Sequence, residues 1–143
     1  MKYTELYESF LAESGISLET AQTNGFRLVA PMEMLHVAGD GTWPGVAIPY
    51  PDPTTGGWSD VVRYRFLGKD GNRHKYHTPK GTKSGIYFPL NGGLPRPKLN
   101  NTAIPVYICE GEKKAIVMQD WLDGQGLPLG LHLLRHDADR ILV

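Results

Sequence analysis

The sequence holds very little cysteine: Cys109 is its one example among 143 residues. A single cysteine can form neither an intramolecular disulfide nor a Cys-x-x-Cys zinc site, so we expect a cytoplasmic protein, where thiols stay reduced. Long hydrophobic runs are also missing. None approaches the roughly 18 residues that a membrane span needs, and the polar start Met1–Glu5 lacks an apolar signal core. We therefore expect no membrane partner.

Common catalytic motifs are absent as well. The sequence has no Gly-x-Ser-x-Gly nucleophile turn, and Lys80-Gly81-Thr82 lacks the preceding glycine spacing of a phosphate-binding P-loop. His74 and His77 lie three residues apart in a polar stretch with no cysteine nearby, which argues against a zinc site. These absences exclude the best-known hydrolase and nucleotide-binding signatures.

The chain has no net charge, because 15 basic residues balance 15 acidic ones, but these charges are unevenly distributed along the sequence. The segment 61–98 holds nine of the basic residues and one acid, Asp70, so it carries +8, while the remaining six basic and fourteen acidic residues give −8. Such a basic block attracts phosphate, and the acidic remainder limits non-specific binding. The alternative is a solvated, lysine-rich sheet face, and the sequence leaves both interpretations open.

Two short helices are predicted at the start of the chain. Apolar residues recur at helical spacing over residues 3–14, and Ser17 can cap a second helix that ends at Thr23, before Asn24-Gly25. Neither helix presents a basic recognition face. We therefore expect the pair to pack on a sheet rather than to read DNA.

The middle of the chain is predicted to be β-rich. Strands are expected at 26–29 and 46–50, with turns filling the rest up to residue 60. Residues 61–66 then alternate apolar and basic side chains, which is typical of a strand with one buried and one charged face. On the charged face, Arg63 and Arg65 are spaced to suit phosphate contacts.

Short strands are also expected at 75–77 and 85–89, followed by a loop over 91–103. Aromatic residues interleave with the basic ones here, as in sheets that bind single-stranded nucleic acid through cationic grooves and stacking rings. Most of these rings are assigned to the core. Tyr76, between Lys75 and His77, is the ring that we expect to be exposed.

A β-α-β unit is predicted at the C-terminal end. Ile104–Cys109 is an almost wholly apolar run, typical of a strand buried on both faces. Glu110-Gly111 follows, then a helix over 112–123 and a strand within 127–134. This order favours parallel pairing of the two strands.

The predicted fold class is thus α/β (α+β), in a single domain of residues 1–143. It comprises a helical lead-in over 1–25, a β-rich basic segment over 26–103 and the partial β-α-β unit over 104–143.

The segment Val106–Ala115, with the sequence VYICEGEKKA, resembles the first motif of the Toprim domains of primases and topoisomerases. In that motif a glutamate ends the first strand, a glycine makes a tight turn and a helix follows. Here these residues are Glu110 and Gly111. An ordered set of weaker matches upstream, over about residues 9–120, resembles a domain of unknown function found in phage and plasmid primases, which precedes or includes the Toprim fold.

The resemblance implies that Glu110 is a catalytic and metal-binding residue. A complete Toprim site adds a later Asp-x-Asp, and the candidate here is Asp137-Ala138-Asp139, 27 residues after Glu110. Together they would form a compressed magnesium site, although magnesium needs several oxygen ligands in near-octahedral geometry. In the alternative, the aspartates belong to a polar tail, no cofactor binds, and Glu110 caps its helix or pairs with Lys113 or Lys114.

Three functions follow from these observations. The first is a non-catalytic, nucleic-acid-associated accessory module derived from a mobile-element primase, which binds DNA or RNA. The second is a phage or mobile-element inhibitor that binds a host nucleic-acid-processing protein complex, in the manner of an anti-CRISPR protein. The third is a metal-dependent phosphoryl-transfer enzyme. Because the ligand set looks incomplete, we expect the protein not to be an enzyme. The expected nucleic-acid or partner contacts are Arg63, Arg65, Arg73, Lys75, Tyr76, Lys80, Lys113 and Lys114.

Overall fold

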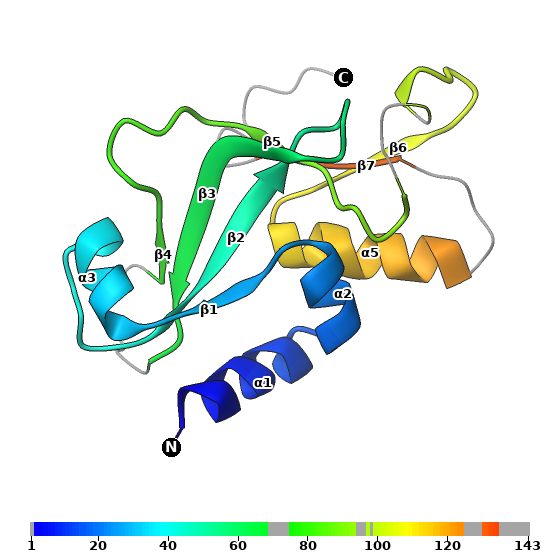
Figure 1. Ribbon diagram of the computed structural model, residues 1–143. Helices are drawn as coiled ribbons and strands as arrows, with labels where there is room; N and C mark the ends of the chain where they lie inside the picture. The colour runs from blue at the N-terminus through cyan, green and yellow to red at the C-terminus, as the bar shows by residue number, and fades with distance from the viewer. Residues whose placement is uncertain (1, 69–74, 94–96, 98, 125–129, 135–143) are drawn as a thin grey trace. The chain divides into compact units, whose positions relative to one another are not determined.

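The chain contains both helices and strands, which confirms the predicted mixed class (Figure 1). The computed structural model describes residues 2–68, 75–93, 97, 99–124 and 130–134. The chain divides into two units that interleave in sequence. The first unit comprises Met1–Pro49 and Asp60–Lys83, and the second comprises Tyr50–Ser59 and Ser84–Val143. Among the helices of the described residues, none is both long and apolar enough to cross a lipid bilayer.

The two predicted helices at the start of the chain are present in the first unit. Helix α1 spans Tyr3–Glu13 and helix α2 spans Leu18–Thr23. The Ser17 hydroxyl accepts a hydrogen bond of 3.1 Å from the backbone N–H of Thr20, so the predicted cap is confirmed. Helix α1 buries Tyr7, Phe10 and Leu11.

A third helix, α3, spans Pro31–Ala38, where turns were expected. The prediction of turns here was wrong, because the segment carries both a helix-starting proline and a helix-ending glycine. Pro31 occupies the first helical turn, where its missing N–H costs nothing, and Gly39 ends the helix with a left-handed φ of 74°.

The first unit contains a four-stranded sheet in the order β1-β2-β3-β4. Its strands are β1 (Arg27–Val29), β2 (Gly45–Pro51), β3 (Trp58–Phe66) and β4 (Tyr76–His77). The pairs β1–β2 and β3–β4 are antiparallel. Strands β2 and β3 continue into residues of the second unit, because the hairpin between them supplies Tyr50–Ser59.

Helices cover both faces of this sheet. On one face, Met34 of α3 packs with Val29, Ala47 and Tyr64 in a buried cluster. A side chain at Gly45 would clash there with Met34 and with the carbonyl oxygen of Arg65, so the close approach of α3 requires glycine. Successive strand residues point to opposite faces, and β3 therefore directs its arginines to the face on which α1 lies.

Replacement of Glu33 by glutamine is expected to lower the free energy of unfolding slightly at pH 7, and to make it depend less on pH in the acid range. Arg27 of β1 donates two hydrogen bonds, of 2.9 and 2.7 Å, to the Glu33 carboxylate of α3, and these bonds lower the pKa of Glu33. A carboxyl group whose pKa is lowered in the folded state stabilises the fold at pH values above its ordinary pKa. This stabilisation is lost as the pH falls through the pKa of the folded state. Because both side chains are more than one third exposed, the difference at pH 7 should stay below about 1 kcal/mol. Urea unfolding at pH 7 and below pH 4 checks this, and a difference that grows in acid would contradict it.

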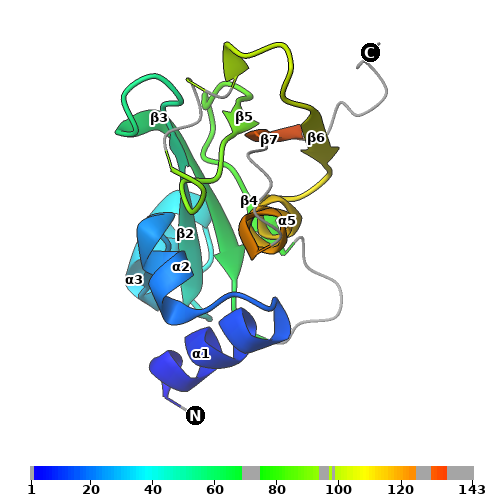
Figure 2. The ribbon, with the colours of Figure 1, turned by 90° about the vertical axis from the view of Figure 1, so that its right-hand side faces the viewer.

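The second unit contains the predicted β-α-β arrangement. Helix α5 (Glu112–Gly124) lies in sequence between β6 (Val106–Cys109) and β7 (Gly130–Leu134), which pair in parallel as predicted. Strand β5 (Ile86–Tyr87) pairs with the other side of β7, giving the order β5-β7-β6. Figures 1 and 2 both show α5 along one face of this small sheet.

Strand β6 is not buried on both faces, so that prediction was wrong. Val106, Tyr107 and Ile108 are 46%, 44% and 47% exposed. The strand lies at the edge of its sheet, and α5 covers one face only, where Cys109 packs against Leu122. Strand β2 does have buried side chains on both faces, because Val46, Ala47 and Ile48 are all buried.

Candidate nucleic-acid interface

The predicted site residues fall into two groups, one in each unit. Arg63, Arg65, Lys75, Tyr76 and Lys80 belong to the first unit, whereas Glu110, Lys113 and Lys114 belong to the second. The other three predicted site residues, Arg73, Asp137 and Asp139, lie outside the described residues.

In the first unit, two arginines and two aromatic rings form a stacked cluster. Arg65 on β3 lies opposite Tyr76 on β4 in the strand register. The Cζ atom of Arg63 is 4.2 Å from the centroid of the Tyr76 ring. The Cζ atom of Arg65 is 5.6 Å from the same centroid and 4.7 Å from that of Phe10, which α1 contributes. Both guanidinium groups are therefore held by aromatic faces.

Burial of this cluster corrects the expected charged face. Arg63 is only 8% exposed, and Tyr76 is half-buried rather than exposed. A guanidinium is planar and weakly hydrated, so it tolerates burial against aromatic rings where an ammonium group would not. The half-buried Arg65 has its Nε atom buried without a hydrogen-bond partner among the described residues. Arg63 and Arg65 thus help to build the sheet, and their contact with nucleic acid stays a prediction.

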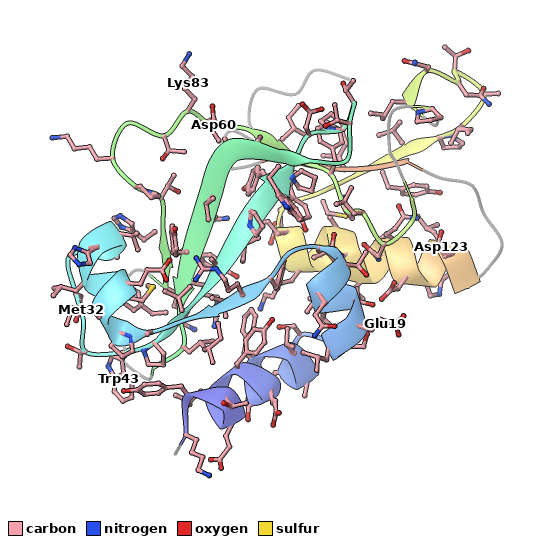
Figure 3. The ribbon with its side chains drawn as sticks, viewed as in Figure 1. Glu19, Met32, Trp43, Asp60, Lys83 and Asp123 are labelled. Carbon is pink, nitrogen blue, oxygen red and sulfur yellow. The ribbon has the colours of Figure 1, made fainter. Side chains whose placement is uncertain are left out.

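The lysines of the same region lie at the surface. Lys75 precedes β4, and Lys80 and Lys83 follow it; all three are exposed. Figure 3 shows the Lys83 side chain extending away from the rest of the chain. Lys83 belongs to the basic segment 61–98 but is not among the predicted contacts, and its exposure places it in the candidate interface.

In the second unit, Glu110 follows β6 and lies at the surface rather than in a crevice. Its carboxylate accepts a hydrogen bond from the Lys114 ammonium, one helical turn further on. The side chains of Lys114 and Glu110 are 64% and 75% exposed. The hydrogen bond and the positive charge of Lys114 lower the pKa of the Glu110 carboxyl. The pairing of Glu110 with Lys114, one of the predicted alternatives, is therefore present.

The glycine of this turn is not required by its backbone. The φ angle of Gly111 lies outside the left-handed region, and a Cβ atom built on it meets nothing within 4 Å among the described residues. The expectation that Gly111 is needed for a tight turn is thus wrong in this structure.

Sequence reasoning missed a buried polar contact beside Glu110. Glu112, the first residue of α5, is 1% exposed and accepts a hydrogen bond of 2.7 Å from the Tyr50 hydroxyl. Tyr87 of β5 meets the Tyr50 ring edge to face, with the ring centroids 5.2 Å apart. Burial, and then the nearby charge of Glu112, raise the pKa of Tyr87 well above its ordinary value. No local pattern marks a contact between residues 62 positions apart.

The described residues do not assemble a metal site. No group of three or more histidine, cysteine, aspartate or glutamate side chains in the described part of the chain is arranged to hold a metal ion. Glu110 supplies one exposed carboxylate, which already pairs with Lys114. Magnesium requires several oxygen ligands. Because Asp137 and Asp139 lie outside the described residues, the magnesium site stays a prediction.

The fold is similar to that of DNA primases. One solved structure, of the DnaG catalytic core, matches with a TM-score of 0.56 and 16% identity over 94% of this chain and 48% of its own. A second, of the DnaG primase catalytic domain bound to ssDNA, matches with a TM-score of 0.54 and 16% identity over 94% of this chain and 49% of its own. The chain therefore spans about half the length of the solved structures that it matches. No family model matches the sequence, and no curated protein matches it. The primase resemblance is confirmed at the level of the fold.

Proposed function

We propose that the chain is a nucleic-acid-associated accessory module, derived from a mobile-element primase, which binds single-stranded DNA or RNA without catalysing a reaction on it. The observation that carries this proposal is the fold shared with the DnaG catalytic structures, one of which has single-stranded DNA bound. The absence of catalysis is inferred from Glu110, a single carboxylate that already pairs with Lys114.

The exposed lysines of the first unit supply the contact surface in this proposal. Lys75, Lys80 and Lys83 offer ammonium groups to phosphates. The half-buried Tyr76 ring, next to Lys75, already stacks on Arg63, so we assign it a supporting role rather than a base contact. Lys113 and Lys114, in the first turn of α5, are proposed as further phosphate contacts of the second unit.

Fluorescence anisotropy with labelled oligonucleotides tests this function. Single-stranded DNA and RNA should bind, and the affinity should fall steeply between about 50 and 200 mM salt because each phosphate contact releases counterions. Magnesium should not be required for binding, and as a competing counterion it should weaken binding as added salt does. No binding even at the lower salt concentration would contradict the proposal, and a requirement for magnesium would favour the metal-dependent phosphoryl-transfer enzyme instead.

A protein partner is the second candidate, and the exposed apolar side chains of the second unit favour it. Val106 and Ile108 lie on the face of β6 opposite Cys109, and Trp121 of α5 is 57% exposed. Contiguous exposed apolar side chains can mark protein contacts, and Val106 and Ile108 are neighbours on one face of the strand. In this alternative the chain inhibits a host nucleic-acid-processing complex. Stable co-purification with one such complex, together with absent oligonucleotide binding, would favour it.

A further inference from the structure

The turn that carries Glu110, Lys113 and Lys114 has an exposed ion pair on its surface and a buried hydrogen bond beneath it. On the surface, Glu110 and Lys114 form an exposed ion pair between residues four apart, and such pairs contribute little to order. The first backbone hydrogen bond of the helix, from the Ala115 N–H to the Gly111 carbonyl oxygen, is 3.0 Å long. The ends of helices fray readily, so the order of these residues depends on the contacts made beneath them.

The interior of the turn is held by Glu112. Glu112 lies between Glu110 and Lys114 in the sequence, but its side chain is buried. Its carboxylate accepts a hydrogen bond from the Tyr50 hydroxyl. Tyr50 is itself only 1% exposed and is packed against Tyr87, which is fully buried. A hydrogen bond to a charged acceptor in such surroundings is among the stronger kinds, and it defines a single orientation of both groups.

We propose that Tyr50 and Glu112 are positioning residues, which fix the β6–α5 turn and so hold Lys113 and Lys114 in a defined arrangement for nucleic-acid phosphates. Contact with phosphates rests on the proposed function, whereas the anchoring of the turn does not. A lysine contributes most to binding when its backbone is ordered before the ligand arrives, because less conformational entropy is then lost on binding. Tyr50 comes from the end of β2, so the hairpin segment Tyr50–Ser59 supplies the anchor to the second unit.

Hydrogen exchange of the full chain tests the anchoring part. In Tyr50→Phe, which removes only the hydroxyl, the Ala115 amide should exchange about tenfold faster, while the Leu122 amide, further along α5, should change much less. Tyr64→Phe, at a buried tyrosine of the first unit, is the matched control and should leave the ratio of the two exchange rates unchanged. Equal acceleration of Ala115 and Leu122 in Tyr50→Phe would mean general destabilisation and would overturn the proposal.

Two variants at Glu112 separate the hydrogen bond from packing. Glu112→Gln keeps an acceptor oxygen for Tyr50 and should retain most of the Ala115 protection, whereas Glu112→Leu should lose it. Loss of protection to the same extent in both variants would show that the hydrogen bond does not position the turn. These variants also decide the question if Tyr50→Phe does not fold.

Oligonucleotide affinity tests the link to binding. Tyr50→Phe should bind single-stranded DNA about tenfold more weakly than the unaltered chain, and Tyr64→Phe should bind equally well. If exchange at Ala115 rises but affinity does not change, the turn is anchored yet does not serve binding, and the proposal is overturned in that part. If the unaltered chain binds no oligonucleotide, the proposed function fails, and the exchange data still decide on the anchor.

Discussion

A variant with Lys75, Lys80 and Lys83 replaced by glutamine is expected to bind single-stranded DNA about 100-fold more weakly near 0.1 M salt. For single strands the slope of log affinity against log salt is negative, and each lost phosphate contact reduces its magnitude by about 0.7, so three lost contacts reduce it by about 2. All three lysines are exposed, and their replacement should leave the fold intact. Anisotropy titrations over a range of salt concentrations measure both the affinity and the slope.

The control for this variant has the same net charge but places the change elsewhere. Thr4, Gln22 and Thr23 are exposed on α1 and α2, and replacing all three by glutamate also lowers the charge by three. This control should bind within about threefold of the unaltered chain, because its altered residues lie outside the proposed contact surface and salt screens exposed charges. Equal weakening in both variants would assign the effect to overall charge and remove the lysines from the interface.

Replacement of Arg63 by glutamate is expected to cost about 3 kcal/mol or more of unfolding free energy. The Arg63 guanidinium is buried at 4.2 Å from the Tyr76 ring centroid, where the negative face of the ring attracts a cation. A carboxylate at this position would meet the same face and would lose its hydration. Urea unfolding, followed by circular dichroism, measures the change.

Lys75→Glu is the matched control for Arg63→Glu, since it makes the same charge reversal at an exposed neighbour of Tyr76. It should change stability by less than about 0.5 kcal/mol. Arg63→Met, which keeps length without charge, should fall between the two. Similar losses in Arg63→Glu and Lys75→Glu would show that the stacked cluster does not stabilise the sheet. Because charge reversal at Arg63 is expected to report on folding, the lysines are the better test of binding.

Local patterns were sufficient for most of the secondary structure. The helical spacing in residues 3–14 and the cap at Ser17 predicted α1 and α2, and the order of the last elements predicted the parallel pairing of β6 with β7. Helix α3 was not predicted, although proline is common in the first turn of a helix and Pro31 occupies that place here. These features depend on residues close in sequence.

Burial was harder to predict because it depends on which elements pack together. The alternation in β3 correctly placed Tyr64 on the face opposite Arg63 and Arg65. It could not predict which helix covers each face. The apolar character of β6 suggested burial, whereas its position at the sheet edge leaves it exposed. In the candidate site, the motif drew attention to Glu110, and the contact between Tyr50 and Glu112 was invisible because it joins distant segments.

The interleaving of the two units has a consequence for dissecting the protein. A fragment that starts at Ser84 would contain α5 and the β5-β7-β6 sheet but would lack Tyr50. The Glu112 carboxylate would then lose the hydrogen bond that it accepts from the Tyr50 hydroxyl. A fragment that ends at Lys83 would keep a hairpin segment, Tyr50–Ser59, whose packing partners are gone. No single cut of the polypeptide gives two fragments that each hold one complete unit and nothing of the other, so a clean separation of the units at one site is not available.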